Sequence, residues 1–346
     1  MGINRILVVN VNWIGDVIFS LPIFKALKRN YPESEIACLA VPRVKKILEA
    51  SHWVDEIIVY DEKGKHRNPL AKLRLIRELR RKKFQIAFLL HRSWTRALLV
   101  FLAGIPERIG YDTKGRGLFL THRVKSLSVH GHRSDYYLNV LESYGIKVED
   151  RGCELNVLPE PKTQLDQLLH RYDVKREDIL IVINPGGNWN LKRWPKENFA
   201  LLINRLSNEV KAKIIISGAD KDYEFALEIA QRSQVNPIVL AGQTDLLQLV
   251  TLMKRANLVI SADTGPLHLA SSVGTDIIGL FGPTKPEMTG PRGKGRIKIL
   301  HHDVGCNREP CYFLTCPDNI CMQSVTVEDV MEAVHQMVQE KFSVVM

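Results

Sequence analysis

The sequence lacks an apolar run long enough to cross a bilayer, and only 7% of its residues are aromatic. Because a membrane-spanning helix needs about 20 consecutive apolar residues, a transmembrane protein is excluded. The first residues, MGINRILVVNV, also lack the basic region, apolar stretch and small-residue cleavage site of a secretory signal, and they indicate a β-strand. We therefore expect a cytoplasmic protein.

Two families of motif are also missing. The first strand-to-helix junction, NVNWIGDVIFSLP, has no GxGxxG pattern, which argues against an NAD-dependent enzyme. No recognisable RNA- or DNA-binding motif occurs, so a basic nucleic-acid-binding protein is a weak alternative and we expect no nucleic-acid partner.

Positive charge is in excess. The chain has 346 residues, with 48 Lys and Arg against 38 Asp and Glu, a formal net charge of +10. This surplus favours an anionic partner: nucleic acid, an acidic membrane surface or a phosphorylated substrate. Basic residues concentrate between Lys72 and Lys83, where the spacing predicts a helix with Leu73, Ile76 and Leu79 or Arg80 on its buried seam. A solvated helix face and contact with acidic lipid both fit this pattern.

Four of the six cysteines recur every five residues, at Cys306, Cys311, Cys316 and Cys321. Zinc sites pair cysteines two to four residues apart, so this spacing is a poor match to the common zinc templates. We expect reduced cysteines in an irregular loop and no metal, and the sequence leaves the role of these thiols open.

Short apolar runs alternate with amphipathic segments along the whole chain, which predicts an α/β protein with parallel sheets. The length indicates two domains, each doubly wound. We place the first at residues 1–160 and the second at 161–325, with Pro159 and Pro161 interrupting the pattern at the seam. Residues 326–346 predict a last helix, capped by Thr326, that packs back across both domains.

One loop suits phosphate. The segment NPGGNWNLKRWP follows a buried strand and contains Gly186, Gly187, Lys192 and Arg193. Glycines after a strand let backbone amides approach an anion, and Lys192 adds a full charge. The glycines also suit a simple turn, and both cations also suit a solvated surface.

A second loop has the same character. In SADTGPLHLA, Asp263 and Thr264 end a strand, Gly265 permits close approach of the backbone, and Pro266 suits the first turn of a helix. The free amides of that helix would form another anion site. His268 lies one turn further on and faces either the ligand or the core.

The first strand-to-helix junction carries Gly15 and Asp16. Asp16 suits a helix cap. In a cleft between two domains it would instead face the phosphate loops of the second domain, where a carboxylate can act as a general base. That arrangement suggests transfer of a group from a nucleotide.

Together, the segments NWIGDVIFSLP, NPGGNWNLKRWP, LAGQTDL, SADTGPLHLA and LFGPTKPEMTGP closely resemble the ADP-heptose:lipopolysaccharide heptosyltransferase family, most of all heptosyltransferase II. The resemblance implies the GT-B fold, in which two Rossmann-like domains face a central cleft. The N-terminal domain would bind the acceptor and the C-terminal domain the nucleotide sugar. The implied reaction is inverting transfer of L-glycero-D-manno-heptose from ADP-heptose to the inner core of lipopolysaccharide, on the cytoplasmic face of the inner membrane.

The resemblance also assigns roles. Asp16 would deprotonate the acceptor hydroxyl and Lys192 would stabilise the departing ADP. Asp222 would contact the ribose, and Gly242 and Thr244 would line the adenine pocket. The full predicted donor site is Gly15, Gly186, Gly187, Asn188, Lys192, Asp222, Gly242, Thr244, Asp263, Thr264, Gly265 and His268. Some relatives have Thr-Thr where this chain has Gly187 and Asn188, so another nucleotide-sugar donor or another acceptor is the alternative.

The predicted acceptor is Kdo-lipid A, or the same lipid already bearing one heptose, and the enzyme would contact the anionic inner-membrane surface. Because lipid A and Kdo are anionic, Arg92, Arg96, Lys114 and Arg116 form a candidate acceptor site, with a solvated surface as the alternative. No cofactor or metal is expected, since side chains and amides can neutralise the diphosphate. The sequence does not decide the oligomeric state.

Overall fold

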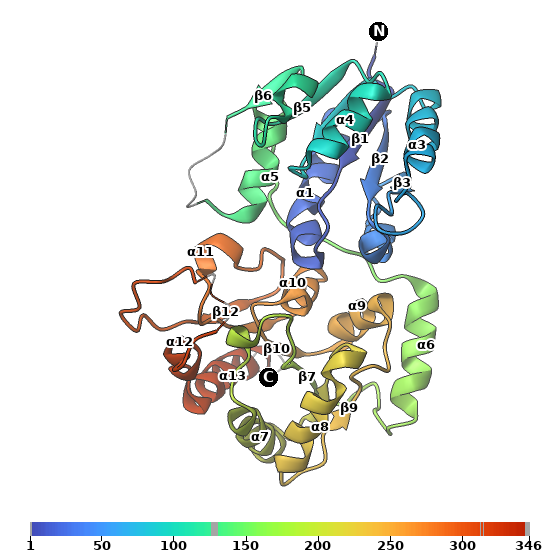
Figure 1. The fold of residues 1–346 in the computed structure, drawn as a ribbon. Helices are drawn as coiled ribbons and strands as arrows, with labels where there is room; N and C mark the ends of the chain where they lie inside the picture. Colours follow the sequence, from blue (N-terminus) through green and yellow to red (C-terminus); the bar gives the residue numbers. More distant parts are fainter. Residues whose placement is uncertain (1, 126–130, 312, 314, 343–346) are drawn as a thin grey trace. The chain divides into compact units, whose positions relative to one another are not determined.

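The computed structural model describes residues 2–125, 131–311, 313 and 315–342. The chain divides into two compact units, Met1–Asn156 and Val157–Met346 (Figure 1). None of the helices in the described ranges combines the length and apolar character that crossing a membrane requires.

In the first unit, the described residues form a six-stranded parallel sheet in the order β3-β2-β1-β4-β5-β6. The strands are β1 (Arg5–Val9), β2 (Glu35–Ala40), β3 (Glu56–Val59), β4 (Ile86–Leu89), β5 (Glu107–Tyr111) and β6 (His122–Val124). The helical segments are α1 (Ile14–Asn30), η1 (Pro42–Val44), α2 (Lys45–Glu49), α3 (Pro69–Arg81), α4 (Trp94–Leu102), η2 (Arg116–Phe119) and α5 (Arg133–Glu142).

Helices cover both faces of this sheet, which is why its strands are apolar runs without alternation. On one face, Leu7 and Val9 of β1 share a core with Leu75 of α3 and Val100 of α4. On the other, α1 and α5 pack against each other (Figure 1). The middle strands are therefore inaccessible to water on either side.

Helix α3 forms where the basic segment predicts it, and its seam includes Ile76 and Leu79 as expected. Leu73 differs, because 39% of it is exposed. The buried stripe runs instead through Ala71, Leu75 and Leu79, which recur at intervals of four residues. Leu73 lies two positions before Leu75, on the opposite side of the helix.

In the second unit, the described residues form a six-stranded parallel sheet in the order β12-β11-β10-β7-β8-β9. The strands are β7 (Leu180–Asn184), β8 (Lys213–Ile216), β9 (Ile238–Val239), β10 (Leu258–Ala262), β11 (Ile277–Leu280) and β12 (Ile297–Leu300). The α-helices are α6 (Pro159–His170), α7 (Lys196–Arg205), α8 (Tyr223–Arg232), α9 (Leu246–Arg255), α10 (Gly265–Ser272), α11 (Pro286–Thr289), α12 (Ile320–Gln323) and α13 (Val327–Phe342). Three further helical segments of the described residues are η3 (Asn190–Lys192), η4 (Leu206–Val210) and η5 (Asp220–Asp222).

Helix α13 packs on α7 and on strands β11 and β12 of its own unit. Its predicted cap is confirmed, because the hydroxyl of Thr326 accepts from the amide of Asp329 at 3.1 Å and the Asp329 carboxylate accepts from the amide of Thr326 at 2.8 Å. The last four residues of the predicted C-terminal segment lie outside the described residues.

At the predicted seam, Pro159 and Pro161 lie at the start of a helix. Pro159 begins α6, and both prolines lie in its first turn. A proline is tolerated there because the first amides of a helix have no intrahelical acceptor. The division between the units falls just before this helix, after Asn156.

Both sheets have the same winding, and it determines where a ligand can bind. In the first sheet the chain leaves β1 toward β2 and later adds β4 on the other side of β1. In the second sheet β8 and β10 flank β7 in the same way. Loops diverge at such a switch point and leave a crevice at the carboxyl ends of the central strands. Functional side chains are therefore expected after β1 and β4, and after β7 and β10.

Trp194 provides a test of the second core. It is 1% exposed, packs edge-on against Phe199 with ring centroids 5.0 Å apart, and donates from Nε1 to the carbonyl of Val325 at 2.7 Å. Trp194→Phe leaves that buried carbonyl unpaired and creates a small cavity, so we expect urea unfolding to show a loss of about 2 kcal/mol. Trp13→Phe, at a side chain that is 55% exposed, should change stability by less than about 0.5 kcal/mol.

Candidate active site

A cavity of about 500 Å³ opens at the carboxyl ends of β1 and β4 in the first unit. It lies at the switch point of the sheet, where the winding predicts a crevice. Its lining combines one carboxylate with several cations and aromatic rings. The lining residues are Val11, Asn12, Trp13, Asp16, Leu90, His91, Arg92, Ser93, Trp94, Lys114, Arg133, Tyr136 and Tyr137.

Asp16 is the carboxylate in this cavity. It lies in the first turn of α1 but is not the helix cap, a position that Trp13 occupies. Its Oδ1 accepts from the hydroxyl of Tyr137 at 2.8 Å and lies 3.6 Å from Nε of Arg133. Burial and the Asp16 charge raise the pKa of Tyr137 well above its usual value, so this phenol remains a donor. Within the described ranges, Oδ2 of Asp16 makes no hydrogen bond and is available to accept a proton.

The cavity is electropositive. Burial, followed by the charges of Arg96, Arg116, Arg92 and Lys114, lowers the pKa of His91 to about 3. A histidine with so low a pKa is neutral at physiological pH. The cations that add to the effect of burial on His91 would attract an anionic ligand.

The four predicted acceptor cations occupy two different positions. Arg92 and Lys114 line the cavity. Arg96 and Arg116 are buried behind it, 1% and 0% exposed. The Arg96 guanidinium donates to the carbonyl of Asn10 and to the side chain of Asn12, both at 2.8 Å.

Arg116 is bound in the same way, because it donates to the carbonyls of Tyr111 at 2.7 Å and Leu89 at 3.4 Å and also to that of His91. Both guanidiniums therefore lie beneath the loops after β1 and β4. Contact with an acceptor is compatible with Arg92 and Lys114. For Arg96 and Arg116 the structure supports a positioning role instead, because both side chains are buried and both bind carbonyls of these loops.

In the second unit, Asp263 is the centre of a network at the end of β10. The Asp263 side chain is 3% exposed. Lys192 donates from Nζ to Oδ2 at 2.6 Å and to the Asp263 carbonyl at 3.0 Å, and Nε2 of His268 lies 3.3 Å from Oδ1. Burial alone would raise the pKa of Asp263, but the hydrogen bond from His268 and the charge of Lys192 hold it well below its usual value. The three predicted residues thus form one charged unit.

Two further members of this network were not predicted as site residues. The hydroxyls of Thr284 and Thr289 donate to Oδ2 of Asp263 at 2.7 and 3.1 Å. Both belong to the segment LFGPTKPEMTGP, which follows β11, the strand next to β10. Their position beyond a strand end was the available signal.

The glycine loop after β7 is packed tightly against the start of α8. A side chain at Gly186 would place its Cβ 2.8 Å from the Asp222 carboxyl carbon, so no larger residue fits without rearrangement. Asp222 pairs with Arg193 at 3.3 Å, and Arg193 also donates to the carbonyl of Gly187 at 2.9 Å. Arg193 is therefore not a solvated cation, because it ties the glycine loop to Asp222.

The remaining predicted donor residues lie in the neighbouring loops. Asn188 accepts from Lys221, and Gly242 donates from its amide to the carbonyl of Gly218 at 3.0 Å. Gly242 has φ +75°, in the region that favours glycine. Thr264 is the N-cap residue of α10, which begins at Gly265. Thr244 precedes α9, whereas Gly15 lies in the first unit beside Asp16.

Across the described ranges, no group of three His, Cys, Asp or Glu side chains is arranged to hold a metal ion. The four late cysteines are free thiols. Asp220 and Asp222 are two residues apart, a spacing at which two carboxylates could share a metal ion, but the Asp222 carboxylate is already paired with Arg193.

A model of glycosyltransferase family 9, the heptosyltransferase family, matches residues 72–314. The chain belongs to this family. Lipopolysaccharide heptosyltransferase 2 of Salmonella typhimurium is 29% identical over 310 residues, covering 83% of this chain and 85% of that protein.

Solved structures agree with the fold. A glycosyltransferase family 9 protein from Veillonella parvula superposes with a TM-score of 0.88 at 27% identity, over 98% of this chain and 99% of the other. The ADP-heptose lipopolysaccharide heptosyltransferase II of Escherichia coli gives a TM-score of 0.80 at 22% identity, over 97% and 99%. The predicted class, GT-B with two Rossmann-like doubly wound domains, is confirmed. The roles of individual residues in this family 9 enzyme stay predictions.

His91 makes the family 9 enzyme sensitive to acid. Its pKa is about 3 in the folded chain, against an ordinary value of 6.5, so the unfolded chain takes up the proton first as the pH falls. Stability from this group is complete above about pH 6.5 and decreases below it. Between pH 7 and pH 5 the loss should be roughly 1 to 2 kcal/mol, allowing for partial solvent screening.

Urea unfolding of wild type and His91→Gln at the two pH values measures this contribution. Glutamine keeps hydrogen-bonding groups but does not titrate, so the variant should lose less stability on acidification. His170→Gln, at an exposed position of the second unit, is the control and should follow wild type. Equal acid sensitivity of His91→Gln and wild type would contradict the low pKa.

Proposed function

We propose that this enzyme transfers L-glycero-D-manno-heptose from ADP-heptose to the inner core of lipopolysaccharide, with inversion at the anomeric carbon. Membership of family 9 carries the proposal. Supporting it, the similar Salmonella protein is a lipopolysaccharide heptosyltransferase 2. The first unit would bind the acceptor and the second the nucleotide sugar, because the cavity with the available carboxylate is in the first and the glycine loop is in the second.

Asp16 is the proposed general base. In a single displacement, Oδ2 takes the proton of the acceptor hydroxyl while its oxygen forms a bond to the anomeric carbon. Tyr137 and Arg133 both contact Oδ1, which orients the carboxylate and leaves the second oxygen for the proton. The bond from the anomeric carbon to the diphosphate breaks, and its electron pair leaves with ADP.

Lys192 is proposed to stabilise the leaving diphosphate. Two of its three N–H groups are directed at Asp263, so the third remains for a phosphate oxygen. Asp263 therefore acts as a positioning residue, with His268 holding its other oxygen. The N-terminus of α10 at Gly265 adds partial positive charge beside this group. Gly186, Gly187 and Asn188 would contribute backbone amides.

The ribose and adenine contacts follow from the same loops. Asp222 would support the ribose, although its carboxylate is engaged by Arg193, so a water-mediated or backbone contact suits it better than a direct one. Gly242 and Thr244 would border the adenine. Neutralisation of the diphosphate by Lys192 and α10 makes a metal unnecessary, which we propose for this enzyme.

The acceptor is proposed to be Kdo-lipid A, or the same lipid carrying one heptose. Carboxylates and phosphates on such a lipid match the cavity in which Arg92 and Lys114 lie beside Asp16. A lipid acceptor requires the enzyme to work at a membrane, so we place it on the cytoplasmic face of the inner membrane. The alternative is another nucleotide-sugar donor, favoured by Gly187 and Asn188 where some relatives have Thr-Thr.

Removing the base should abolish transfer and spare donor binding. We expect Asp16→Asn to lower the rate of heptose transfer by at least about 1000-fold, because the amide cannot accept the proton. ADP affinity, measured by calorimetry, should remain within about two-fold. Asp112→Asn is the control, since Asp112 is exposed and does not line the cavity. Transfer by Asp16→Asn at a rate near wild type would remove Asp16 from the base role.

Removing the Lys192 ammonium should weaken nucleotide binding. We expect Lys192→Ala to bind ADP at least about 10-fold more weakly in calorimetric titrations, because one charged contact to the diphosphate is lost. The titrations contain a chelator, and ADP-heptose, UDP-glucose and NAD are compared with ADP.

The matched control is Lys196→Ala, four residues further on, whose ammonium pairs with Glu228. It should bind ADP like wild type. Unchanged ADP affinity in Lys192→Ala would mean that the glycine loop is only a turn and does not bind phosphate. Tighter binding of UDP-glucose than of ADP-heptose would establish the alternative donor, and binding that disappears with chelator would contradict the metal-free proposal.

A further inference from the structure

Most of the net positive charge of this chain comes from one segment. Residues 63–83 contain ten Lys and Arg and one acidic residue, Glu78, a net charge of +9, while the whole chain carries +10. The remaining residues are therefore almost neutral. The ten cations are Lys63, Lys65, Arg67, Lys72, Arg74, Arg77, Arg80, Arg81, Lys82 and Lys83.

Five of the ten cations lie in helix α3, and none of them belongs to its buried set of Ala71, Leu75, Ile76 and Leu79. The other five precede or follow the helix. Arg74, Arg77 and Arg81 are exposed and form no ion pair with the part of the chain that the structure describes. Their charge is thus uncompensated, unlike that of an ordinary solvated helix with alternating signs.

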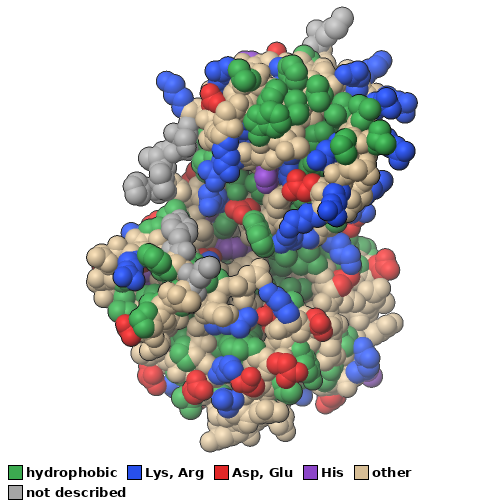
Figure 2. Space-filling view, in the orientation of Figure 1, with side chains coloured by type: hydrophobic (Ala, Val, Ile, Leu, Met, Phe, Trp, Pro, Cys, Tyr) green, Lys and Arg blue, Asp and Glu red, His purple; other side chains and the backbone are tan. Residues whose placement is uncertain are grey.

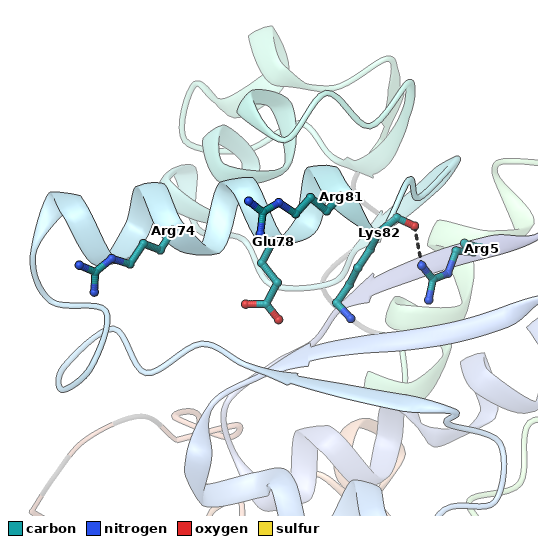
Figure 3. A pocket seen from close by; sticks show the side chains of 5 residues that line it. All are labelled: Arg5, Arg74, Glu78, Arg81 and Lys82. Atoms are coloured by element: carbon teal, nitrogen blue, oxygen red, sulfur yellow. Dashed lines mark hydrogen bonds between the residues drawn. The ribbon is translucent and has the colours of Figure 1, made fainter.

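A recess of about 430 Å³ lies beside the second half of this helix, lined by Arg5, Arg74, Glu78, Arg81 and Lys82. Figure 3 shows Glu78 and Lys82 projecting to the same side of the helix, with Arg5 donating to the Lys82 carbonyl at 2.8 Å. The recess lies at the amino end of β1, whereas Asp16 lies beyond the carboxyl end of that strand. The recess therefore belongs to the basic surface and not to the candidate active site.

Apolar side chains lie exposed beside the cations. Helix α4 packs on α3, and Arg80 donates to the carbonyl of Leu102 at 2.6 Å. Phe101 and Leu102 are 43% and 41% exposed, and Leu118 of η2 is 79% exposed. In Figure 2 hydrophobic side chains gather over the region of α4, with Lys and Arg beside them over α3. A soluble surface does not need so many large apolar groups at one place.

The apolar surface continues to the cavity that contains Asp16. The Phe119 ring lies 5.5 Å from that of Phe101 and 5.0 Å from that of Trp94. Trp94 is 46% exposed and lines the cavity. A row of aromatic rings therefore connects the exposed apolar residues to the proposed acceptor site within one unit.

We propose that α3, α4 and η2 form a docking surface for an anionic lipid bilayer, with the cations on lipid headgroups and Phe101, Leu102 and Leu118 inserted at their boundary. This surface, defined by residues 63–83, Phe101, Leu102 and Leu118, deepens the proposed function, because it delivers the enzyme to its lipid acceptor. Cations alone would equally suit nucleic acid. The apolar residues among them favour a bilayer, whose interface takes both groups.

Vesicle sedimentation tests the proposal with the full-length enzyme. Vesicles of phosphatidylcholine with one-third phosphatidylglycerol should bind the protein strongly, and vesicles of phosphatidylcholine alone should bind it far more weakly. The variant Arg74→Glu/Arg77→Glu/Arg81→Glu should partition about 100-fold less onto the anionic vesicles, since each basic residue near such a surface contributes about five-fold. Leu118→Asp should also weaken partitioning, and this loss should persist at high salt.

The matched control reverses three exposed cations of the second unit, Arg171→Glu/Lys175→Glu/Arg176→Glu. It should bind vesicles nearly as well as wild type, and both triple variants should bind ADP normally, which shows that they are folded. Equal losses in the two triple variants, or none in either, would overturn the docking surface. So would binding of RNA that depends on α3 but not on Leu118, without vesicle binding. Vesicle binding by an enzyme that fails to transfer heptose would refute the proposed function alone.

Discussion

A single buried carboxylate organises the second unit. Asp263 is removed from water at the end of β10, where burial penalises its charge, so it requires charged or polar partners from every neighbouring loop. Lys192 comes from the loop after β7, His268 from α10, and Thr284 and Thr289 from the segment after β11. The loops that would receive a diphosphate are therefore fixed in place before any ligand arrives.

The first unit solves a similar problem with opposite charges. Arg96 and Arg116 are buried beneath the loops after β1 and β4, where they donate to backbone carbonyls and, from Arg96, to the Asn12 side chain. They shape the cavity floor and set its potential, while Arg92 and Lys114 remain at its wall for a ligand. In the second unit the Asp263 carboxylate holds Lys192 in place. In the first unit the guanidiniums of Arg96 and Arg116 hold the backbone of the loops in place. Preorganisation of this kind lowers the reorganisation needed during reaction.

Much of this was accessible from the sequence, because apolar runs and the loops after them identify parallel strands and their carboxyl ends. That topology brings the loops of Lys192 and Asp263 to the same end of the sheet, but the ion pair between them was not predicted. Arg96 and Arg92 were not distinguishable, since both follow β4 and only the tertiary packing buries one of them. Thr284 and Thr289 were missed because hydroxyls carry no charge signal. The sequence pattern did not show that Pro159 begins a helix, because a proline interrupts a periodicity both between elements and at a helix start.

The burial of Arg116 explains why a lysine could not replace it without changing the electrostatics of the cavity. Burial lowers the pKa of Arg116 to about 10, which still leaves the guanidinium fully ionised in the cell. A lysine starts from a lower intrinsic pKa, so the same desolvation would bring its ammonium toward neutrality and make the cavity's potential vary with pH. Its single nitrogen would also satisfy fewer carbonyls. An arginine at this position therefore keeps the positive charge of the site constant over a wider pH range than a lysine would.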